Sequence, residues 1–458
     1  MTKVIGIDLG TTFSAIASLD DLGNPEVLAS IEDNRKITAS AIYIEGKNVI
    51  VGDKALNYIK DEPKKVILQT KREMENDVVY SVDQGKWTSD NDLVDAYTPA
   101  QVSSLILKKL KDYTADVKKA VITVPAMFAE KARQATLDAA KMADLEVIAL
   151  INEPTAAVLH YASLPGVEVG GRVMIFDLGG GTFDVTFAEV KNKKVDVLTS
   201  RGDKYLGGKD FDWEIAKLIK KKYFEVHNVE IDIENNKEYT QKSEEIKKIL
   251  SVKNKTSTSI NGPKGLQQIE ITQEEFEESI QTYIEKIKML IEEAMEASGM
   301  KPSRINQTLL VGGSTRIPLI TKILTNIMGK PPVKGVNVDE AVVCGAAIYA
   351  GLKTEKKILN TEQQEALKDV NLTDVCNFYM GTLAVVRDHL TNRDVIANTI
   401  IIERDSKLPV STTKRLYTIS EGQETLECSV TQSEGPEENK EFVNIIHQED
   451  LKLPKDRP

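Results

Sequence analysis

Two stretches of the chain show nearly the same order of apolar and polar positions. Residues 4–16 read VIGIDLGTTFSAI, and residues 173–187 read VMIFDLGGGTFDVTF. In both, an apolar run ends in Asp-Leu-Gly, small residues and threonine follow, and a second apolar run contains phenylalanine. This order predicts a strand, a tight turn and a second strand, which together form a β-hairpin. The repeat predicts two lobes of similar construction that face each other.

Helices are predicted between the strands from capping signals and apolar spacing. Residues 98–101 (Thr-Pro-Ala-Gln) form a capping box with proline at the first helical position. Residues 272–275 form a second capping box, which opens a long amphipathic helix closed by Gly299. Further predicted elements are a strand over 120–124 and helices over 129–143 and 313–329. Strands that alternate with helices in this way predict an α/β architecture.

The pattern changes after Leu352. Residues 353–369 are rich in lysine, glutamate and glutamine, which is typical of a charged helix end and a linker. From Val375 onward, short β-type runs separated by turn residues predict an all-β region. These runs are 399–403, 415–419 and 426–431. The predicted units are a domain over 1–352, a linker over 353–372 and a β-domain over 373–458.

The composition restricts the class of protein. The 458 residues are 41% hydrophobic, enough for a large core, and about three domains are expected at roughly 150 residues each. Because 59 Lys and Arg face 70 Asp and Glu, the net charge of −11 argues against a general nucleic-acid or acidic-membrane binder. Cys344, Cys376 and Cys428 form no C-x-x-C pair, so a reducing compartment is the simpler interpretation. With no signal peptide and no apolar run of about 18 residues, the sequence predicts a cytoplasmic protein.

The two predicted turns carry residues suited to a phosphate site. The first turn contains Asp8, Gly10, Thr11, Thr12 and Phe13. Glycine lets backbone N–H groups approach a phosphate closely, and a carboxylate at a strand end can hold Mg²⁺ through water. For one such turn, a hairpin that needs glycine only for its geometry is the simpler interpretation. A second turn with a triple glycine and two acids makes a shared clamp on one phosphate chain the better interpretation.

Other candidates are weaker when their residues are taken alone. Residues 311–316 (VGGSTR) end a strand and open a helix, where free N–H groups bind anions, but a plain strand-to-helix turn is an equal alternative. Residues 207–209 (GGK) lack the flanking residues of a Walker A loop. Lys71, Glu153 and the helix around Glu244 are each consistent with ordinary surface or capping roles. The four scattered histidines argue against a histidine metal site.

Taken together, the motifs resemble a known family. The matching stretches, in family order, are IGIDLGTTFSAIA, Lys71-Arg72, AVITVPAMF, ARQAT, INEPTAA, FDLGGGTFDV, LGGKDFD, LVGGSTRIP and VDEAVVCGAA. They resemble the actin–hexokinase–heat-shock ATPase superfamily and, within it, the DnaK-type heat-shock chaperones of the 70-kDa class. The resemblance spans residues 3–352, and the C-terminal runs look like the opening of that family's peptide-binding β-domain.

The resemblance implies an α/β fold: a two-lobed actin-like (ribonuclease H-like) ATPase with duplicated mixed-sheet cores, followed by a partial all-β substrate-binding domain. It implies ATP hydrolysis, with ATP/ADP, Mg²⁺ and K⁺ as cofactors. The implied catalytic residues are Lys71, Glu153, Asp177 and Thr182, and the implied metal-side residues are Asp8, Asp177 and Asp184. The implied nucleotide contacts are Gly10, Thr11, Thr12, Phe13, Gly180, Gly181, Gly207, Gly208, Glu244, Lys247, Lys248, Ser251, Gly313, Ser314, Thr315, Arg316 and Asp339.

The resemblance also implies the biological role and the partners. It implies a chaperone that binds extended, unfolded polypeptides under the control of ATP hydrolysis, with a J-domain co-chaperone and a nucleotide-exchange factor, and without nucleic acid or membrane. Three alternatives stay open: a weakly or non-catalytic relative acting as an exchange factor or structural partner, a small-molecule kinase, and an actin-like filament protein. The retained lysine and acids argue against the first, and the sequence offers no sugar pocket for the second. The β-rich extension has no role in the third.

Several positions depart from the family pattern. Lys248 stands where the family usually has arginine, so we expect weaker packing on adenine. Tyr205 replaces a histidine and Met127 an aromatic residue. In the linker, Asn371 and Thr373 replace two leucines, each worth roughly 1.5–3 kcal/mol when buried, so weak linker docking and reduced coupling are expected. The chain also ends about midway through the family's β-domain, so a partial domain without a helical lid is expected.

Overall fold

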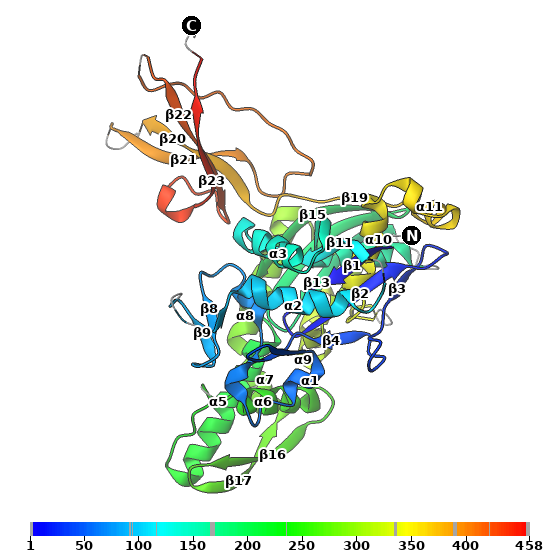
Figure 1. Ribbon diagram of the computed structural model, residues 1–458, viewed down its shortest axis with the longest axis vertical. Helices are drawn as coiled ribbons and strands as arrows, with labels where there is room; N and C mark the ends of the chain where they lie inside the picture. Colours follow the sequence, from blue (N-terminus) through cyan, green and yellow to red (C-terminus); the bar gives the residue numbers. More distant parts are fainter. Residues whose placement is uncertain are drawn as a thin grey trace.

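The computed structural model describes residues 3–90, 93, 95–115, 117–164, 170–234, 236–333, 337–387, 392–420 and 422–454. Figure 1 shows a large α/β body with a β-rich region at one end. The first mixed sheet of the body has the order β12 (Glu146–Asn152), β11 (Val117–Val124), β1 (Lys3–Asp8), β2 (Phe13–Leu19) and β3 (Pro25–Val27), with β4 (Ile37–Ala39) beside β2. The antiparallel pair β1–β2 confirms the first predicted hairpin.

The second mixed sheet contains the other predicted hairpin. Its order is β18 (Gln307–Val311), β13 (Gly170–Leu178), β14 (Phe183–Lys191), β15 (Lys194–Asp203) and β19 (Asn371–Thr373). Strands β13 and β14 are antiparallel, and Asp177 lies directly opposite Asp184. Like charges at opposed positions destabilise a sheet, so this pair is unusual on structural grounds alone.

Two buried helices pack between the sheets. They are α4 (Glu153–Ser163) and α10 (Ala341–Lys353), and almost every residue of α10 is buried, as an all-apolar helix requires. At their crossing, a Cβ on Gly345 would lie 1.8 Å from the carbonyl oxygen of Ala156. Only glycine therefore permits this close approach. Because α4 begins with Glu153, the crossing also fixes the position of that carboxylate.

The helices predicted from capping signals are present, with two differences at their ends. Helices α2 (Pro99–Lys111) and α3 (Glu130–Met142) lie where they were predicted. The long helix opened by the Thr272–Glu275 capping box is interrupted at Ile280, giving α7 (Gln273–Ser279) and α8 (Gln281–Ser298). The segment predicted as one helix over 313–329 divides into a 3₁₀ turn, η4 (Gly313–Arg316), and α9 (Pro318–Met328). Proline at 318 explains this break, because the residue before a proline disfavours the helical region.

The remaining elements of the body complete the outer parts of the two lobes. On the first lobe they are β5 (Ile42–Glu45), β6 (Asn48–Val51), α1 (Asp53–Leu56), η1 (Pro63–Lys65), β7 (Val66–Ile67), η2 (Thr70–Glu73), β8 (Val79–Ser81), β9 (Lys86–Thr88) and β10 (Ala96–Tyr97). On the second lobe they are α5 (Gly208–His227), α6 (Lys237–Leu250), β16 (Lys255–Gly262), β17 (Gly265–Thr272) and η3 (Pro302–Arg304). Figure 1 shows α5, α6, β16 and β17 at the end opposite the β-rich region.

The β-rich region is an antiparallel sheet. Its order is β21 (Asp394–Ile402), β20 (Tyr379–Arg387), β22 (Thr425–Ser433) and β23 (Asn444–Lys452), with η6 (Lys440–Phe442) before β23. The predicted runs 399–403 and 426–431 lie in β21 and β22, but the strand predicted over 415–419 is wrong. Those residues are exposed and pair with no strand in the described ranges, and the Ile419 N–H donates to the Gln423 side chain rather than to another strand. The predicted β-domain continues to 458, and its last four residues lie outside the described residues.

The segment predicted as a linker is largely ordered. It contains η5 (Lys356–Ile358) and α11 (Thr361–Leu367), and β19 then pairs in parallel with β15 of the second sheet. Val370 and Val375 are buried on either side of this strand, whereas Asn371 is exposed. A leucine at 371 in this register would remain largely in water. The linker thus lies against the body, and the strength of that contact remains a prediction, as do the domain boundaries.

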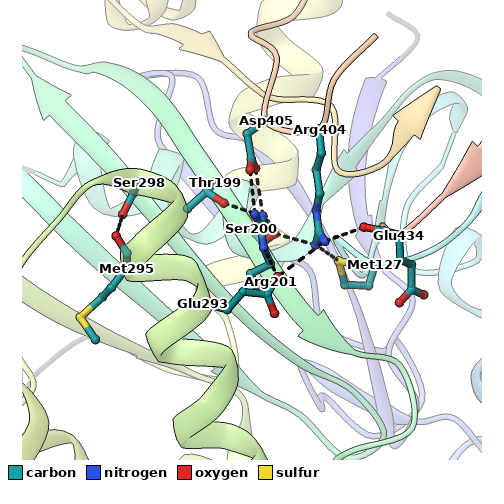
Figure 2. Close-up of polar contacts among 10 residues, drawn as sticks. All are labelled: Met127, Thr199, Ser200, Arg201, Glu293, Met295, Ser298, Arg404, Asp405 and Glu434. Atoms are coloured by element: carbon teal, nitrogen blue, oxygen red, sulfur yellow. Dashed lines mark hydrogen bonds and ion pairs between the residues drawn. The ribbon is translucent and has the colours of Figure 1, made fainter. Parts of the chain in front are cut away.

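A second contact, here called the seam, joins the β-rich region to the body through charged side chains. Arg201 on β15 holds Asp405 with two hydrogen bonds of 3.0 and 2.8 Å and Glu293 on α8 with a third of 2.6 Å (Figure 2). Arg404 donates to the backbone oxygens of Ser200 and Glu434. The bidentate geometry suits the planar guanidinium, and each charge of this network has an opposite partner.

Apolar and neutral polar contacts surround the seam. Met127 packs in a small buried cluster with Phe378 of the β-rich region. Asn377 donates to the backbone oxygen of Ala126 at 2.8 Å, and the Gln432 side chain accepts from the N–H of Glu130 at the start of α3. No helix in the described part of the chain combines the length and apolar character needed to cross a bilayer.

Candidate functional site

The turns of the two hairpins meet in the centre of the body. A Cβ on Gly180 would lie 2.0 Å from the hydroxyl oxygen of Thr12, and one on Gly181 would lie 2.6 Å from the Thr11 side chain. Any larger residue would therefore push the turns apart. This contact confirms that the repeated motifs face each other. It also explains why the second turn needs consecutive glycines.

A cavity of about 110 Å³ lies beside this contact. The predicted residues that line it are Asp8, Gly10, Thr11, Thr12, Phe13, Lys71, Glu153, Asp177, Gly180, Thr182, Gly313 and Asp339. They come from the two hairpins, from η2, from the start of α4, from η4 after β18 and from the turn before α10. The structure therefore brings together all four predicted catalytic residues, which are far apart in the sequence.

Three carboxylates, Asp8, Glu153 and Asp177, line this cavity, and a fourth, Asp184, lies close behind them; we call these four the acidic cluster. Burial raises the pKa of Asp177 well above its ordinary value, and the charges of Glu153, Asp184 and Asp8 raise it further. Burial also raises the pKa of Asp184 to about 7, with a contribution from the charge of Glu153. The cluster thus concentrates more negative charge than its surroundings neutralise, which is the condition for attracting a cation.

Lys71 faces the acidic cluster from the first lobe. It lies in η2, is buried, and its ammonium group pairs with the carboxylate of Glu153. Its charge opposes the rise in the pKa of Glu153 that burial causes, and it acts in the same way on Asp8. Asp8 also accepts a hydrogen bond of 2.8 Å from the Thr123 hydroxyl. Lys71 is therefore held in the cavity as a positive group beside several carboxylates.

The donor set fits hydrated Mg²⁺. The Thr12 hydroxyl oxygen and one carboxylate oxygen of Asp184 are buried and make no hydrogen bond with any described residue. Across the described ranges, no three His, Cys, Asp or Glu side chains converge closely enough to ligate a metal directly. Carboxylates held slightly apart suit Mg²⁺, which keeps several of its water ligands. Asp8, Asp177 and Asp184 would hold the ion through such waters.

A larger cavity of about 370 Å³ adjoins the first and lies between the second-lobe helix α6 and η4. Its predicted residues are Thr12, Phe13, Gly180, Glu244, Lys247, Lys248, Ser251, Gly313, Ser314, Arg316 and Asp339. Arg316 and Asp339 form a bidentate ion pair of 3.0 and 2.7 Å at its exposed side. The Ser314 hydroxyl donates to the backbone oxygen of Gly179, which ties η4 to the second turn. This cavity has the size and mixed polarity of a nucleoside site.

Several predicted residues support the site from behind. Asp184, Gly181, Gly207, Gly208 and Thr315 line neither cavity. A Cβ on Gly207 would collide with the backbone of Gly181 at 2.6 Å, and the N–H of Gly208 donates to the carbonyl oxygen of Gly179 at 3.0 Å. These residues hold the second turn in place.

Three residues near the cavities were not among the predicted site residues. Lys209 and Asp212 lie on α5 with a spacing of three, and Asp212 is fully buried. That spacing within LGGKDFD was the available signal, but lysine after two glycines was considered only as a Walker A lysine. Lys237, the first residue of α6, donates across to the first lobe, to the backbone oxygens of Pro63 and Val66. A lysine at a helix start opposes the helix dipole, which was the signal there.

Comparisons with known proteins agree with this geometry. The sequence pattern of the Hsp70 protein family matches residues 4–446. The chain is 34% identical over 452 residues to the chaperone protein DnaK of Thermotoga petrophila and, equally, of Thermotoga maritima, covering 94% of this chain and 71% of each relative. It is 35% identical to the chaperone protein DnaK of Thermosipho africanus, covering 70% of that protein.

Proposed function

Because the chain belongs to the Hsp70 family, we propose that its central cavity hydrolyses ATP to ADP and phosphate, using Lys71, Glu153, Asp177 and Thr182. The chain is an ATP-dependent chaperone of the heat-shock class, and nucleotide turnover controls its hold on unfolded polypeptide. One observation carries the proposal: three carboxylates of the acidic cluster and the buried Lys71 line the cavity where two glycine-threonine turns touch, with Asp184 close behind.

The residues of the cavity match the demands of phosphoryl transfer, which are mainly positioning and charge neutralisation. Backbone N–H groups of the two turns and the hydroxyls of Thr11 and Thr12 donate to the phosphates. The ammonium group of Lys71 stabilises the charge that develops on the transferred phosphoryl group and positions the attacking water. Glu153 keeps Lys71 in place, and Thr182 assists in orienting the water. Mg²⁺, when bound with ATP, neutralises phosphate charge.

The adenosine part of ATP occupies the larger cavity. Glu244, Lys247, Lys248 and Ser251 contact it from α6, and Ser314, Arg316 and Asp339 contact it from the other side. Lys248 is exposed and lies 5.9 Å from the centre of the Phe13 ring. Its compact ammonium cannot stack on a base as a guanidinium does, so we expect weak contact with adenine there. Potassium is proposed as a further ion beside Mg²⁺.

Partners of this activity follow from the family. Unfolded or extended polypeptides are the clients, and we propose a J-domain co-chaperone and a nucleotide-exchange factor as regulators. Placement in the cytoplasm stays a prediction from the sequence.

The test compares ATP turnover of the intact chain with that of Lys71→Ala. We expect turnover to fall about 100-fold or more while nucleotide still binds, because a preorganised charge at the reacting group is lost. The control is Lys357→Ala, which removes an exposed lysine paired with Glu355. An extended apolar peptide, added to both, reports whether polypeptide binding changes turnover.

Two outcomes would contradict the proposal. Equal turnover in the wild type and Lys71→Ala would exclude this lysine from the chemistry. Tight nucleotide binding with no turnover in the wild type would favour the non-catalytic relative, which uses the same cavity only to hold a nucleotide.

A further inference from the structure

We propose that Lys209 is a positioning residue of the nucleotide site: it fixes Glu244 as a hydrogen-bond acceptor for a donor group of the nucleoside and thereby sets which nucleotides the chain prefers. This proposal rests on the proposed nucleotide function and adds to it a residue that the site prediction did not contain. It concerns the nucleoside side of the cleft, away from the acidic cluster.

The first observation is an alternating chain of charges that links α5 and α6. Lys247 contacts Asp212 at 2.8 Å, and Asp212 lies 3.5 Å from Lys209. Lys209 donates to one carboxylate oxygen of Glu244 at 2.6 Å. Lys248 contacts the other oxygen of Glu244 at 2.9 Å. Lys209 therefore sits between two carboxylates and is the link through which Glu244 is tied to α5.

The second observation is the position of this chain between two cavities. A further cavity of about 220 Å³ extends between the lobes toward Lys237. Lys209, Glu244, Lys248, Thr12 and Phe13 line both this cavity and the larger nucleoside cavity. The Lys209–Glu244–Lys248 bridge thus forms part of the wall between them. If Glu244 rotated, both the wall and the shape of the nucleoside cavity would change.

The two lysines that hold Glu244 differ in rigidity. The Lys209 side chain is 11% exposed, whereas the Lys248 side chain is 61% exposed. Burial alone would lower the pKa of Lys209, but the charges of Asp212 and Glu244 outweigh it and raise that pKa. A buried, charged lysine is a fixed anchor, while an exposed one exchanges readily with water. Orientation of Glu244 accordingly depends on Lys209.

The chemistry of the ligand group follows from the charge state of Glu244. Burial acts to raise the pKa of Glu244, but Lys209 and Lys248 hold it at about 2. An ionised carboxylate only accepts hydrogen bonds. The donors that ATP or ADP offers on its nucleoside are the two ribose hydroxyls and the amino group of adenine. A donor group of one of these two sources is the partner of Glu244, and nucleotide analogues distinguish them.

Substitution of Lys209 should alter recognition without unfolding the chain. Asp212 is fully buried, and in Lys209→Met it retains its 2.8 Å contact with Lys247, so its charge stays paired. Glu244 then keeps only the exposed Lys248. Lys209→Arg preserves the charge and serves as the rescue variant. Lys217→Met is the matched control, because Lys217 lies on the same helix and pairs with Glu214 at the surface.

The experiment measures the affinity of the full chain for ADP, 2′-deoxy-ADP, 3′-deoxy-ADP, inosine diphosphate and pyrophosphate by titration calorimetry. In the wild type, ADP should bind about tenfold more tightly than the analogue that lacks the donor facing Glu244. Weaker binding of a deoxy analogue than of ADP would identify a ribose hydroxyl as the donor to Glu244. Weaker binding of inosine diphosphate would identify the adenine amino group. In Lys209→Met this preference should shrink to about twofold, with pyrophosphate affinity unchanged, and Lys209→Arg should restore it.

A companion measurement keeps the result interpretable. Glu244→Gln should reduce the same preference, and adding Lys209→Met to it should reduce the preference no further, because both changes act through one carboxylate. Undiminished preference in Lys209→Met would overturn the proposal. Equal weakening of all ligands, pyrophosphate included, would show a merely structural role and would also overturn it. If the wild type binds none of the nucleotides, the proposed function itself fails, a result that is distinct from both.

Discussion

The cleft lies between the two lobes, and the seam lies between the body and the β-rich region. The two differ in how far their buried charges have partners of opposite sign. In the cleft, four carboxylates of the acidic cluster face Lys71, and burial raises the pKa of Asp177 and Asp184. In the seam, Arg201 makes three charge-assisted bonds to Asp405 and Glu293, and these contacts raise its pKa although burial opposes them.

The cleft is therefore a site with an excess of negative charge, whereas the seam is an interface whose charges are largely paired. Buried charges are costly unless they are paired. The cleft carries an excess of negative charge, as we expect if a cation and a phosphate chain bind there as proposed. In the seam, carboxylate and carbonyl oxygens pair with both arginines, although the buried Nε of Arg404 makes no hydrogen bond with a described residue. Three of the predictions below change either the cleft or the seam and leave the other intact, and the fourth tests a buried group of the body.

The largest effect is expected from Asp177→Asn in the cleft. Turnover of ATP should fall about 100-fold, because a carboxylate that orients the hydrated metal is lost. The melting temperature of the ligand-free chain should rise, since one of several mutually repelling charges disappears. Asp138→Asn, on the exposed face of α3, is the control. A lower melting temperature without ligand would mean that the acidic cluster is not a source of repulsion.

A smaller effect is expected from Arg201→Ala in the seam. Asp405 loses its guanidinium partner and Glu293 keeps only the longer, 3.8 Å contact with Arg404. Because these carboxylates are 20% and 52% exposed, the lost stability is well below that of a fully buried pair. Protease cleavage within residues 369–375 should accelerate about tenfold as the β-rich region detaches. Arg387→Ala removes exposed contacts with Asp394 and Asn392 within the β-rich region, and this variant should be cleaved at the wild-type rate. Identical cleavage of both variants would show that the linker alone holds this region.

A still smaller effect is expected from Lys237→Met, at a contact between the two lobes. Lys237 donates to the backbone oxygens of Pro63 and Val66 and to the Tyr80 hydroxyl. Lys237→Met should accelerate ADP release about fivefold, because these charge-assisted bonds between the lobes are lost. Stopped-flow release of a fluorescent ADP measures it. Lys242→Met on the same helix, which contacts the second lobe only, should leave the rate unchanged.

The smallest effect is expected on the pH dependence of the melting temperature, through a buried histidine of the body. Burial lowers the pKa of His160 in α4 from 6.5 to about 4, so the folded state disfavours the charged imidazole. The contribution of the buried neutral imidazole to folding stability is therefore fully present above pH 6.5 and is lost as the pH falls toward 4. Between pH 7 and 5, the melting temperature of His160→Gln should fall about 2 °C less than that of the wild type. A parallel fall in both would show that His160 is not buried in solution.

The sequence predicted the structural features that depend on residues close together in the chain. The turns with Gly10 and Gly180, the capping boxes and the strands of both hairpins follow from local patterns of apolar residues, glycine and threonine. The proposed catalytic residues followed only from resemblance, because Lys71 and Glu153 lack any local motif. Geometry then showed that they meet.

What the sequence could not predict is pairing between distant positions. Arg201 and Asp405 are 204 residues apart, and each alone is an ordinary surface charge. The strand expected over 415–419 failed for the same reason, since β-type composition does not supply a partner strand. The broken helix at Pro318 was predictable, because the rule for residues before proline applies there.

The crossing of α4 and α10 has a mechanical consequence. Gly345 leaves the two helices in backbone contact, so the lobes share a pivot with almost no thickness. Glu153 lies within one turn of that pivot, whereas α6, with Lys237, lies far from it (Figure 1). A small rotation about this crossing would displace Glu153 little, because it lies near the axis, and would displace α6 more, because it lies far from the axis. In such a rotation we expect the wall of the larger cavity that α6 forms to move further than Glu153.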